Sequence, residues 1–367
     1  MSRLHDLYYE QGQSPWLDNL RRGWLTSGEL VRWVERGVRG ITSNPTIFQK
    51  AISSSDEYDA QFGELIGGGQ AVDAAYWTMV TDDIENALRI LRPVHDESAG
   101  VDGFVSVEVA PDLARDCDGT LASARELHER IAEPNLFVKV PATAEGVEAI
   151  RILIGEGRSI NVTLIFGLDR YREVMEAYIS GLEAYDGDLS QVASVASFFV
   201  SRVDTEVDRR LDAIGTDAAL ALRGKAAVAQ AQLAYQRFVE TFRGPRWQAL
   251  ADRGARVQRP LWASTSTKNP EYPDALYVDT LIGPDTVNTM PEATLEAFED
   301  HGTLARTVDA DPEAAQRTLD AIEEAGVDLD EVSRVLEDQG VATFAKSFDE
   351  LINALEAKAE STPGGSG

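Results

Sequence analysis

Short apolar runs alternate along this chain with longer segments in which apolar residues recur at helical spacing. The short runs have the composition of β-strands, and they lie at residues 16–17, 40–45, 103–111, 135–141, 159–166, 192–200, 260–265 and 276–282. Regular alternation of strands and helices is typical of a parallel sheet, and eight units predict an α/β fold of the (β/α)8 TIM-barrel type. A doubly wound sheet is the alternative, but no glycine-rich phosphate loop follows an early strand.

The alternation runs without a convincing linker, so we expect a single barrel domain over residues 1–360 with helical additions. These additions are expected above all at the C-terminus, where residues 292–359 are helical in pattern and acidic. They either cover the barrel mouth or extend the outer shell. Residues 361–367 are rich in glycine and serine, which predicts a flexible tail or a cloning remnant.

Lys139 interrupts the apolar run at residues 135–141, near the C-terminal end of that predicted strand. A buried ammonium group is costly unless it is paired or neutralised. An uncharged lysine amine is the nucleophile that forms Schiff bases with ketones, a role that arginine cannot take. The ordinary alternative is a lysine whose ammonium reaches solvent from the strand end.

Polar residues also occur near the C-terminal ends of other predicted strands: Asp18, Asn44, Glu108, Asn161, Thr163 and Ser197. Each has an ordinary explanation, such as a helix cap, a turn or a salt bridge with Lys139. Glu108, however, shares its strand face with the small residues Ser106 and Ala110, as expected inside a barrel. Because the strand ends of a barrel meet at one mouth, we expect these side chains to converge there.

Together these residues permit a coherent ketone chemistry. Lys139 would attack a carbonyl and form an iminium, which withdraws electrons during carbon–carbon cleavage. Asp18 is the candidate that takes the proton from the substrate hydroxyl, while Glu108 and Thr163 could hold the water that forms and hydrolyses the iminium. Asn44, Asn161 and Ser197 could contact the hydroxyls of a small polyol.

A candidate phosphate site follows the later strands. Arg202 comes directly after the run at 192–200, and Ser266 and Lys268 lie in the polar segment 264–269 after the next strand. Hydroxyls, backbone N–H groups and a cation after the last strands of a barrel commonly bind phosphate. An ordinary polar loop is the alternative at this position.

Composition limits the partners. The formal net charge of −28 argues against nucleic acid or an anionic membrane, although a few local cations can still bind one phosphate. The single cysteine, Cys117, excludes an internal disulfide and suits the cytoplasm, and no apolar run reaches transmembrane length. The four histidines are scattered without metal-ligand spacing, so we expect no metal and no cofactor. We expect a monomer or a homodimer.

Five motifs together resemble transaldolase, a family of Schiff-base enzymes, in order along the chain from about Asp18 to Met290. They begin at Ile41 (Ile-Thr-Ser-Asn-Pro-Thr), Ser106 (Ser-Val-Glu-Val), Phe137 (Phe-Val-Lys-Val-Pro-Ala-Thr), Asn161 (Asn-Val-Thr-Leu-Ile-Phe) and Ala263 (Ala-Ser-Thr-Ser-Thr-Lys-Asn). The length and the segment around Trp262 look like the longer bacterial transaldolases.

The resemblance implies a (β/α)8 barrel with its Schiff-base lysine on the fourth strand, where Lys139 falls. It implies transfer of a dihydroxyacetone unit from sedoheptulose 7-phosphate to glyceraldehyde 3-phosphate in the non-oxidative pentose phosphate pathway. The residue roles that it implies are a general acid/base (Asp18), a water-positioning pair (Glu108 and Thr163), donor-sugar contacts (Asn44, Asn161 and Ser197) and a phosphate site (Arg202, Ser266 and Lys268).

Two positions depart from the family pattern. Position 268 is lysine where many relatives have arginine, so a point charge replaces a bidentate contact. Phe198 stands where proline is common. Two other functions stay open at this point: an aldolase of the fructose-6-phosphate type that releases free dihydroxyacetone, and a non-catalytic barrel that binds sugar phosphates.

Overall fold

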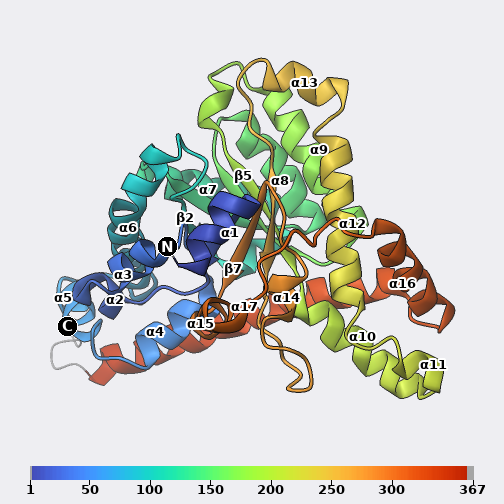
Figure 1. The fold of residues 1–367 in the computed structure, drawn as a ribbon. Coiled ribbons are helices and arrows are strands. Elements are labelled where there is room, and N and C mark those ends of the chain that lie inside the picture. Colours follow the sequence, from blue (N-terminus) through green and yellow to red (C-terminus); the bar gives the residue numbers. More distant parts are fainter. Residues whose placement is uncertain (1, 362–367) are drawn as a thin grey trace.

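The computed structural model describes residues 2–361, and a parallel sheet lies at their centre (Figure 1). The strands found there are β1 (Gln13–Leu17), β2 (Val105–Glu108), β3 (Leu136–Pro141), β4 (Ile160–Ile165), β5 (Ser194–Phe199), β6 (Arg259–Ala263) and β7 (Thr286–Met290). They pair in parallel in the order β1-β7-β6-β5-β4-β3-β2. Every residue of every strand is buried, which explains why the runs read as almost continuously apolar.

Ile41 closes this sheet into a ring. It forms parallel bridges with Leu17 of β1 on one side and with Val105 of β2 on the other. The backbone N–H of Ile41 donates to the carbonyl of Phe104 at 2.9 Å, and the N–H of Thr42 donates to the carbonyl of Leu17 at 3.0 Å. Ile41 therefore occupies the second of eight strand positions in the barrel, and β3, which carries Lys139, occupies the fourth, as predicted.

The glycine before Ile41 is required by close packing. A Cβ atom at Gly40 would lie 2.4 Å from the indole ring of Trp16, which is fully buried in the barrel. The predicted strand at 40–45 is reduced to this single bridging residue. The reason is that Asn44 caps a helix beginning at Pro45, so the chain turns away from the sheet at once.

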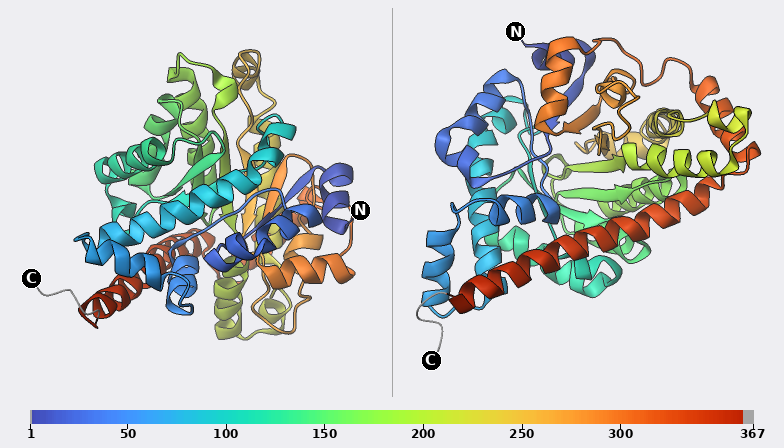
Figure 2. Two further views of the ribbon diagram at one scale, coloured as in Figure 1. Left: turned by 90° about the vertical axis from the view of Figure 1, so that its left-hand side faces the viewer. Right: turned by 90° about the horizontal axis from the view of Figure 1, so that it is seen from below.

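Helices surround the ring in Figures 1 and 2. Those within residues 2–361 are α1 (Arg3–Gln11), α2 (Arg22–Ser27), α3 (Glu29–Arg36), α4 (Pro45–Ser53), α5 (Asp59–Gly67), α6 (Val72–Glu97), α7 (Cys117–Ile131), α8 (Ala144–Gly155), α9 (Leu168–Ala184), α10 (Ser201–Ile214), α11 (Asp217–Leu220), α12 (Ala226–Thr241), α13 (Pro245–Ala251), α14 (Leu276–Asp279), α15 (Glu292–His301), α16 (Pro312–Glu324) and α17 (Leu329–Ser361), with short 3-10 turns η1 (Pro111–Arg115) and η2 (Leu189–Gln191).

The prediction of a last strand at residues 276–282 is wrong. Leu276–Asp279 forms the short helix α14, and the last strand of the barrel is β7, which begins ten residues further along the chain. All five residues of β7 (Thr-Val-Asn-Thr-Met) are buried, but the sequence does not indicate this because three of the five side chains are polar. Hydrogen bonds inside the protein accompany this burial: the Asn288 side-chain N–H donates to the carbonyl of Tyr277 at 3.3 Å, and the Thr286 hydroxyl donates to the carbonyl of Gly283 at 2.6 Å.

A buried ionic cluster fills the N-terminal end of the barrel. Asp102 is completely buried, and its carboxylate is paired with Arg259 at 3.0 Å and with Arg39 at 3.1 Å. The Ser14 hydroxyl and the Trp16 indole N–H also donate to this carboxylate, at 2.8 and 3.1 Å. Burial alone would raise the pKa of Asp102, but the two arginines outweigh it and hold that pKa below its ordinary value. This end of the barrel is therefore closed by structure rather than open to a ligand.

Helix α17 crosses the opposite end of the barrel. In the right-hand view of Figure 2, which looks at the molecule from below, α17 (red) crosses the side that faces the viewer. The Thr46 hydroxyl on α4 lies 2.8 Å from the Ser347 hydroxyl on α17, and a Cβ at Gly340 would come within 3.0 Å of Leu164 on β4. Of the two arrangements open to the C-terminal helices, α17 thus packs over the mouth. Residue 361 ends α17, and the rest of the predicted tail, 362–367, lies outside the described residues.

Among residues 2–361 no helix combines the length and the apolar character needed to cross a membrane.

Candidate active site

A cavity of about 500 Å³ lies at the C-terminal ends of the strands, between the barrel and helices α4 and α17. Eight of the ten predicted site residues line it: Asp18, Asn44, Lys139, Thr163, Ser197, Arg202, Ser266 and Lys268. The two others, Glu108 and Asn161, lie directly beside lining residues in the barrel interior, and the sheet register explains how. Lys139 is in register with Glu108 on β2 and with Asn161 on β4, so the three side chains form one layer.

Lys139 is buried at the end of β3 and points into the barrel mouth. Its side chain is only 4% exposed, and its Nζ lies 3.1 Å from Oε2 of Glu108 and donates to the carbonyl of Ser43 at 3.0 Å. The alternative of a lysine that reaches solvent is therefore excluded. A buried amine that borders a cavity and has a carboxylate neighbour can exchange a proton with that carboxylate.

Glu108 lies on the far side of the lysine from Asn161. Its side chain is 4% exposed, and burial raises the pKa of its carboxyl, although Lys139 opposes that rise. Glu108 lines a second, very small cavity of about 10 Å³, together with Ser43, Asn44 and Tyr76. This volume is close to the smallest that holds one water molecule. Thr163 lines the main cavity instead, so the predicted water-binding pair flanks Lys139 from two sides.

Asp18 follows β1, and its position is fixed by backbone and side-chain contacts. Its N–H donates to the carbonyl of Met290 at 2.9 Å, and the Thr42 hydroxyl donates to its Oδ1 at 2.7 Å. Burial raises the pKa of Asp18, while the Thr42 hydrogen bond and the positive charge of Lys139 counteract part of that rise. A carboxylate of this kind is a stronger proton acceptor than one in water.

Thr163 sits in an irregular part of β4. The pairing of β4 with β5 shifts between Val162 and Ile165, and Leu164 has a φ of +60°, which is rare for a branched residue. The Thr163 hydroxyl is buried and has no hydrogen-bond partner among the described residues, although it borders the cavity. Backbone strain next to an unsatisfied hydroxyl is typical of a functional position.

Asn161 and Ser197 form one hydrogen-bonded unit inside the barrel. The Ser197 hydroxyl donates to Asn161 Oδ1 at 2.7 Å, and the Asn161 amide donates to the Ser106 hydroxyl at 3.0 Å. Asn44 caps α4 by accepting the N–H of Ile47 at 3.0 Å and also borders the cavity. The ordinary explanation for Asn44, a local backbone contact, is thus correct and compatible with a place in the site.

The cavity is positively charged although the chain is strongly acidic. Its lining contains five basic residues (Arg21, Lys50, Lys139, Arg202 and Lys268) and one acidic residue, Asp18. Arg202, the second residue of α10, makes no hydrogen bond or ion pair within residues 2–361, and its guanidinium lies over the rings of Phe199 and Phe344. Partial burial lowers the pKa of Lys268, and the nearby Arg202 lowers it further. Such a concentration of positive charge fits an anionic ligand.

Several lining residues were not predicted. Thr42 orients Asp18, Lys50 comes from α4, and Thr343 and Phe344 come from α17. Thr42 could have been predicted from the sequence, since it lies in the motif that contains Asn44. The α17 residues were not, because a helix far along the chain gives no local sign of the cavity that it covers.

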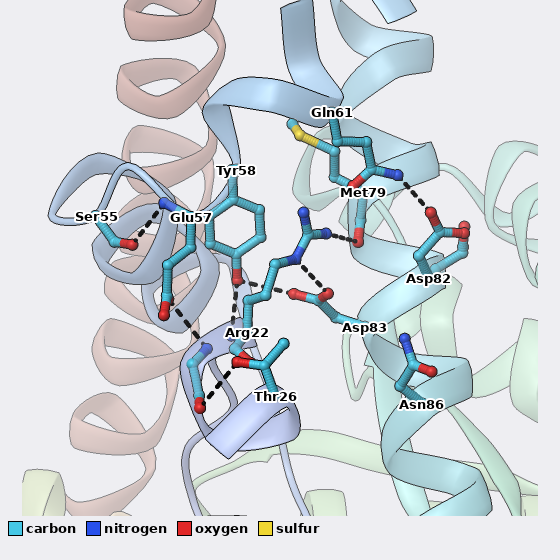
Figure 3. A network of polar contacts seen from close by, with 12 residues as sticks. Arg22, Thr26, Ser55, Glu57, Tyr58, Gln61, Met79, Asp82, Asp83 and Asn86 are labelled. Atoms are coloured by element: carbon cyan, nitrogen blue, oxygen red, sulfur yellow. Dashed lines mark hydrogen bonds and ion pairs between the residues drawn. The ribbon is translucent and has the colours of Figure 1, made fainter. Parts of the chain in front are cut away.

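A network of polar contacts joins α2 and α6 to the segment that follows α4 (Figure 3). The Tyr58 hydroxyl, between α4 and α5, donates to Asp83 of α6 at 2.8 Å, and Arg22 of α2 pairs with the same carboxylate at 2.9 Å. The Arg22 guanidinium also lies 4.2 Å from the centre of the Tyr58 ring. These contacts join α2, the start of α5 and α6.

Comparison with known proteins agrees with this geometry. The family model described as transaldolase/fructose-6-phosphate aldolase matches residues 15–355. The chain belongs to this family. It is 52% identical over 352 residues to a transaldolase of Mycolicibacterium smegmatis, covering 95% of each chain. It is 52% identical over 351 residues to a transaldolase of Thermobifida fusca, covering 94% of this chain and 95% of the relative, and 50% identical over 363 residues to Transaldolase 2 of Streptomyces coelicolor, covering 98% and 96%.

The chain is accordingly an enzyme, a transferase of the transaldolase type within this family. The names of these relatives favour transaldolase over the aldolase alternative, and a non-catalytic barrel gains no support.

Proposed function

We propose that this enzyme transfers a dihydroxyacetone unit from sedoheptulose 7-phosphate to glyceraldehyde 3-phosphate through a Schiff base on Lys139. The observation that carries this proposal is the buried lysine amine, 3.1 Å from a carboxylate, at the wall of a cationic cavity that also contains Asp18. An amine in this setting can attack a ketone and then stabilise negative charge at the neighbouring carbon.

The reaction begins at the lysine. Transfer of a proton to Glu108 leaves the Lys139 amine neutral, and its nitrogen attacks the ketone carbon of the donor sugar. The resulting carbinolamine loses its hydroxyl as water and becomes an iminium. Glu108 supplies the proton that this departing hydroxyl needs, and its small cavity has room for the water, while the unpaired Thr163 hydroxyl can contact the reacting oxygen.

Carbon–carbon cleavage needs a base at the other side of the bond. Asp18 takes the proton from the hydroxyl of the fourth sugar carbon, the bond between the third and fourth carbons breaks, and its electron pair moves toward the iminium to give an enamine. Erythrose 4-phosphate leaves as the aldehyde. The enamine then attacks the carbonyl of the acceptor, Asp18 returns its proton to the new hydroxyl, and water hydrolyses the iminium to release fructose 6-phosphate.

The remaining predicted residues would bind the substrate. Asn44 and the Asn161–Ser197 pair face the region around Lys139 and would contact the hydroxyls of the donor. Arg202, Ser266 and Lys268 would bind the terminal phosphate, and the free guanidinium of Arg202 can form the bidentate contact that Lys268 cannot. We further propose that the reaction belongs to the non-oxidative pentose phosphate pathway in the cytoplasm, with no cofactor.

The test is an assay of erythrose 4-phosphate production from sedoheptulose 7-phosphate with and without glyceraldehyde 3-phosphate. We expect multiple turnovers only when the acceptor is present, since the enamine stays on the enzyme until an aldehyde arrives. Steady release of free dihydroxyacetone without an acceptor would favour the aldolase alternative. A Lys139→Met variant with full activity would overturn the mechanism.

A further inference from the structure

The loop that carries Ser266 and Lys268, residues 264–275, is fastened at its start to the helix that carries Arg202. The backbone N–H of Ser201, the first residue of α10, donates to the carbonyl of Ser264 at 3.0 Å, and the two serine hydroxyls lie 2.9 Å apart. Ser264 itself has a φ of +55°, so the chain enters the loop through an unfavourable backbone conformation. These contacts hold the first residue of the loop but not the lysine four residues later.

A second attachment lies beyond the lysine. The Tyr272 hydroxyl donates to Oδ2 of Asp208 on α10 at 2.5 Å, and the other oxygen of Asp208 accepts the N–H of Gly224 at 2.9 Å. The Tyr272 ring lies against Gly224, where a Cβ atom would come within 2.7 Å of the ring and where φ is +68°. Only glycine fits this position without strain, so the seat of the tyrosine ring is closely shaped.

A parallel attachment lies one helical turn earlier. The Tyr277 hydroxyl, on α14 just after the loop, donates to Asp204 Oδ2 at 2.7 Å, and Oδ1 of Asp204 accepts the N–H of Ala227 at 2.8 Å. Asp204 and Asp208 are four residues apart and share one face of α10. Helix α10, which contains Arg202, thus holds the loop at Tyr272 and holds α14 at Tyr277.

The attached loop places the positive charge of Lys268 within the electrostatic influence of Arg202. Arg202 and Lys268 both line the cavity, and their positive charges repel each other. Within residues 2–361 the one hydrogen bond of the Lys268 amine goes to a serine of its own loop, Ser266, at 2.7 Å. Without an outside restraint the loop would therefore gain by moving its lysine away from the arginine whenever no anion is present.

We infer that the Tyr272–Asp208 hydrogen bond is a positioning contact that keeps Ser266 and Lys268 beside Arg202, so that the three groups bind the terminal phosphate of the substrate together. Neither Tyr272 nor Asp208 lines the cavity, so the pair acts through the loop. The inference rests on the proposed function, because it assigns the cationic end of the cavity to phosphate.

The test compares two ketones that form the same Schiff base. Borohydride trapping is measured against concentration for fructose 6-phosphate and for dihydroxyacetone, which has no phosphate. Tyr272→Phe should raise the half-saturating concentration about tenfold for the phosphorylated ketone, well within the effect of losing one hydrogen bond to a charged group. The substitution should leave the half-saturating concentration of dihydroxyacetone unchanged. An equal change for both ketones, or no change for either, would overturn the inference.

Three further proteins sharpen the result. Asp208→Asn can keep both contacts, by accepting from Gly224 and donating to Tyr272, and should behave like the wild type. Asp208→Ala removes the acceptor and should reproduce the selective loss, which covers the case of an unstable Tyr272→Phe. Tyr9→Phe is the matched control, since Tyr9 is 67% exposed and lies on α1.

Binding of inorganic phosphate, measured by calorimetry, separates the inference from the proposed function because it requires no Schiff base. Weaker phosphate binding by Tyr272→Phe than by the wild type would support the inference even if no ketone were trapped. Equal phosphate binding by the two proteins would overturn it, whatever the trapping experiment showed.

Discussion

Replacing Asp18 by asparagine should remove carbon–carbon cleavage while leaving Schiff-base formation intact. Asparagine has the shape of aspartate and keeps an oxygen that can accept the Thr42 hydroxyl, which now lies 2.7 Å from Oδ1. The backbone contact with Met290 is unaffected. What the variant lacks is the ability to take a proton from the sugar hydroxyl.

The size of the effect follows from that single lost role. General acid–base catalysis by one side chain contributes about 10²- to 10⁴-fold, which corresponds to about 3 to 5 kcal/mol in the activation free energy. Stability should not fall, because burial raises the pKa of Asp18 and therefore disfavours its ionised form in the folded protein. An uncharged amide at this position should unfold at the same urea concentration as the wild type or a higher one.

The assay measures two quantities on the same preparation. Erythrose 4-phosphate release from sedoheptulose 7-phosphate reports cleavage, and borohydride trapping with dihydroxyacetone, which has no bond to cleave, reports attack by Lys139. We expect release to fall at least a hundredfold and trapping to stay within about twofold of the wild type. Asp217→Asn, on the exposed side of α11, is the control. Release at the wild-type rate would refute the role of Asp18, and loss of trapping would refute its restriction to cleavage.

Three other predictions concern buried charge. Since burial raises the pKa of both Asp18 and Glu108, kcat/KM should begin to fall with decreasing pH above their ordinary values of 3.8 and 4.5, and a flat pH–rate profile down to pH 4 would contradict this. Burial also raises the pKa of Asp204 to about 6, so the contribution of Asp204 to stability is complete below about pH 4 and is lost as pH rises through 6. Between pH 4 and 8, the free energy of unfolding of Asp204→Asn in urea should therefore rise relative to that of the wild type by up to about 3 kcal/mol. A difference between the two proteins that does not depend on pH would be inconsistent with this shift. Asp102→Ala should lower the free energy of unfolding by about 3 to 5 kcal/mol, because it leaves Arg259 and Arg39 without their buried partner. The control Asp338→Ala removes an exposed ion pair with Arg115 and should change the free energy of unfolding little. Equal effects of the two substitutions would argue that the buried ionic cluster does not stabilise the protein.

Much of the barrel could be predicted because its strands are buried on both faces and read as apolar runs. Lys139 and Glu108 stood out for the same reason, since a charge within such a run needs a partner, and each is the partner of the other. The motif around Asn44 predicted a turn after a strand, and the structure has a capped helix after a single bridging residue.

The failures also have physical causes. Strand β7 was missed because Asn288 and its threonines are polar, and their burial depends on partners that only the folded chain supplies. Whether the C-terminal helices cover the cavity stayed open, because α17 reaches it by contacts between residues far apart in sequence, such as Thr46 with Ser347. The small cavity beside Glu108 depends on Tyr76, which comes from another helix, and no spacing in the sequence indicates it.

The role of Lys139 as the nucleophile can be measured through the mass of the peptide that contains residue 139 after treatment with fructose 6-phosphate and borohydride. Retro-aldol cleavage leaves a three-carbon unit on the amine, so we predict that this peptide gains the mass of a reduced dihydroxyacetone adduct and that Lys139→Met abolishes the gain. An adduct on any other lysine, or none at all in an active preparation, would rule out Lys139 as the nucleophile.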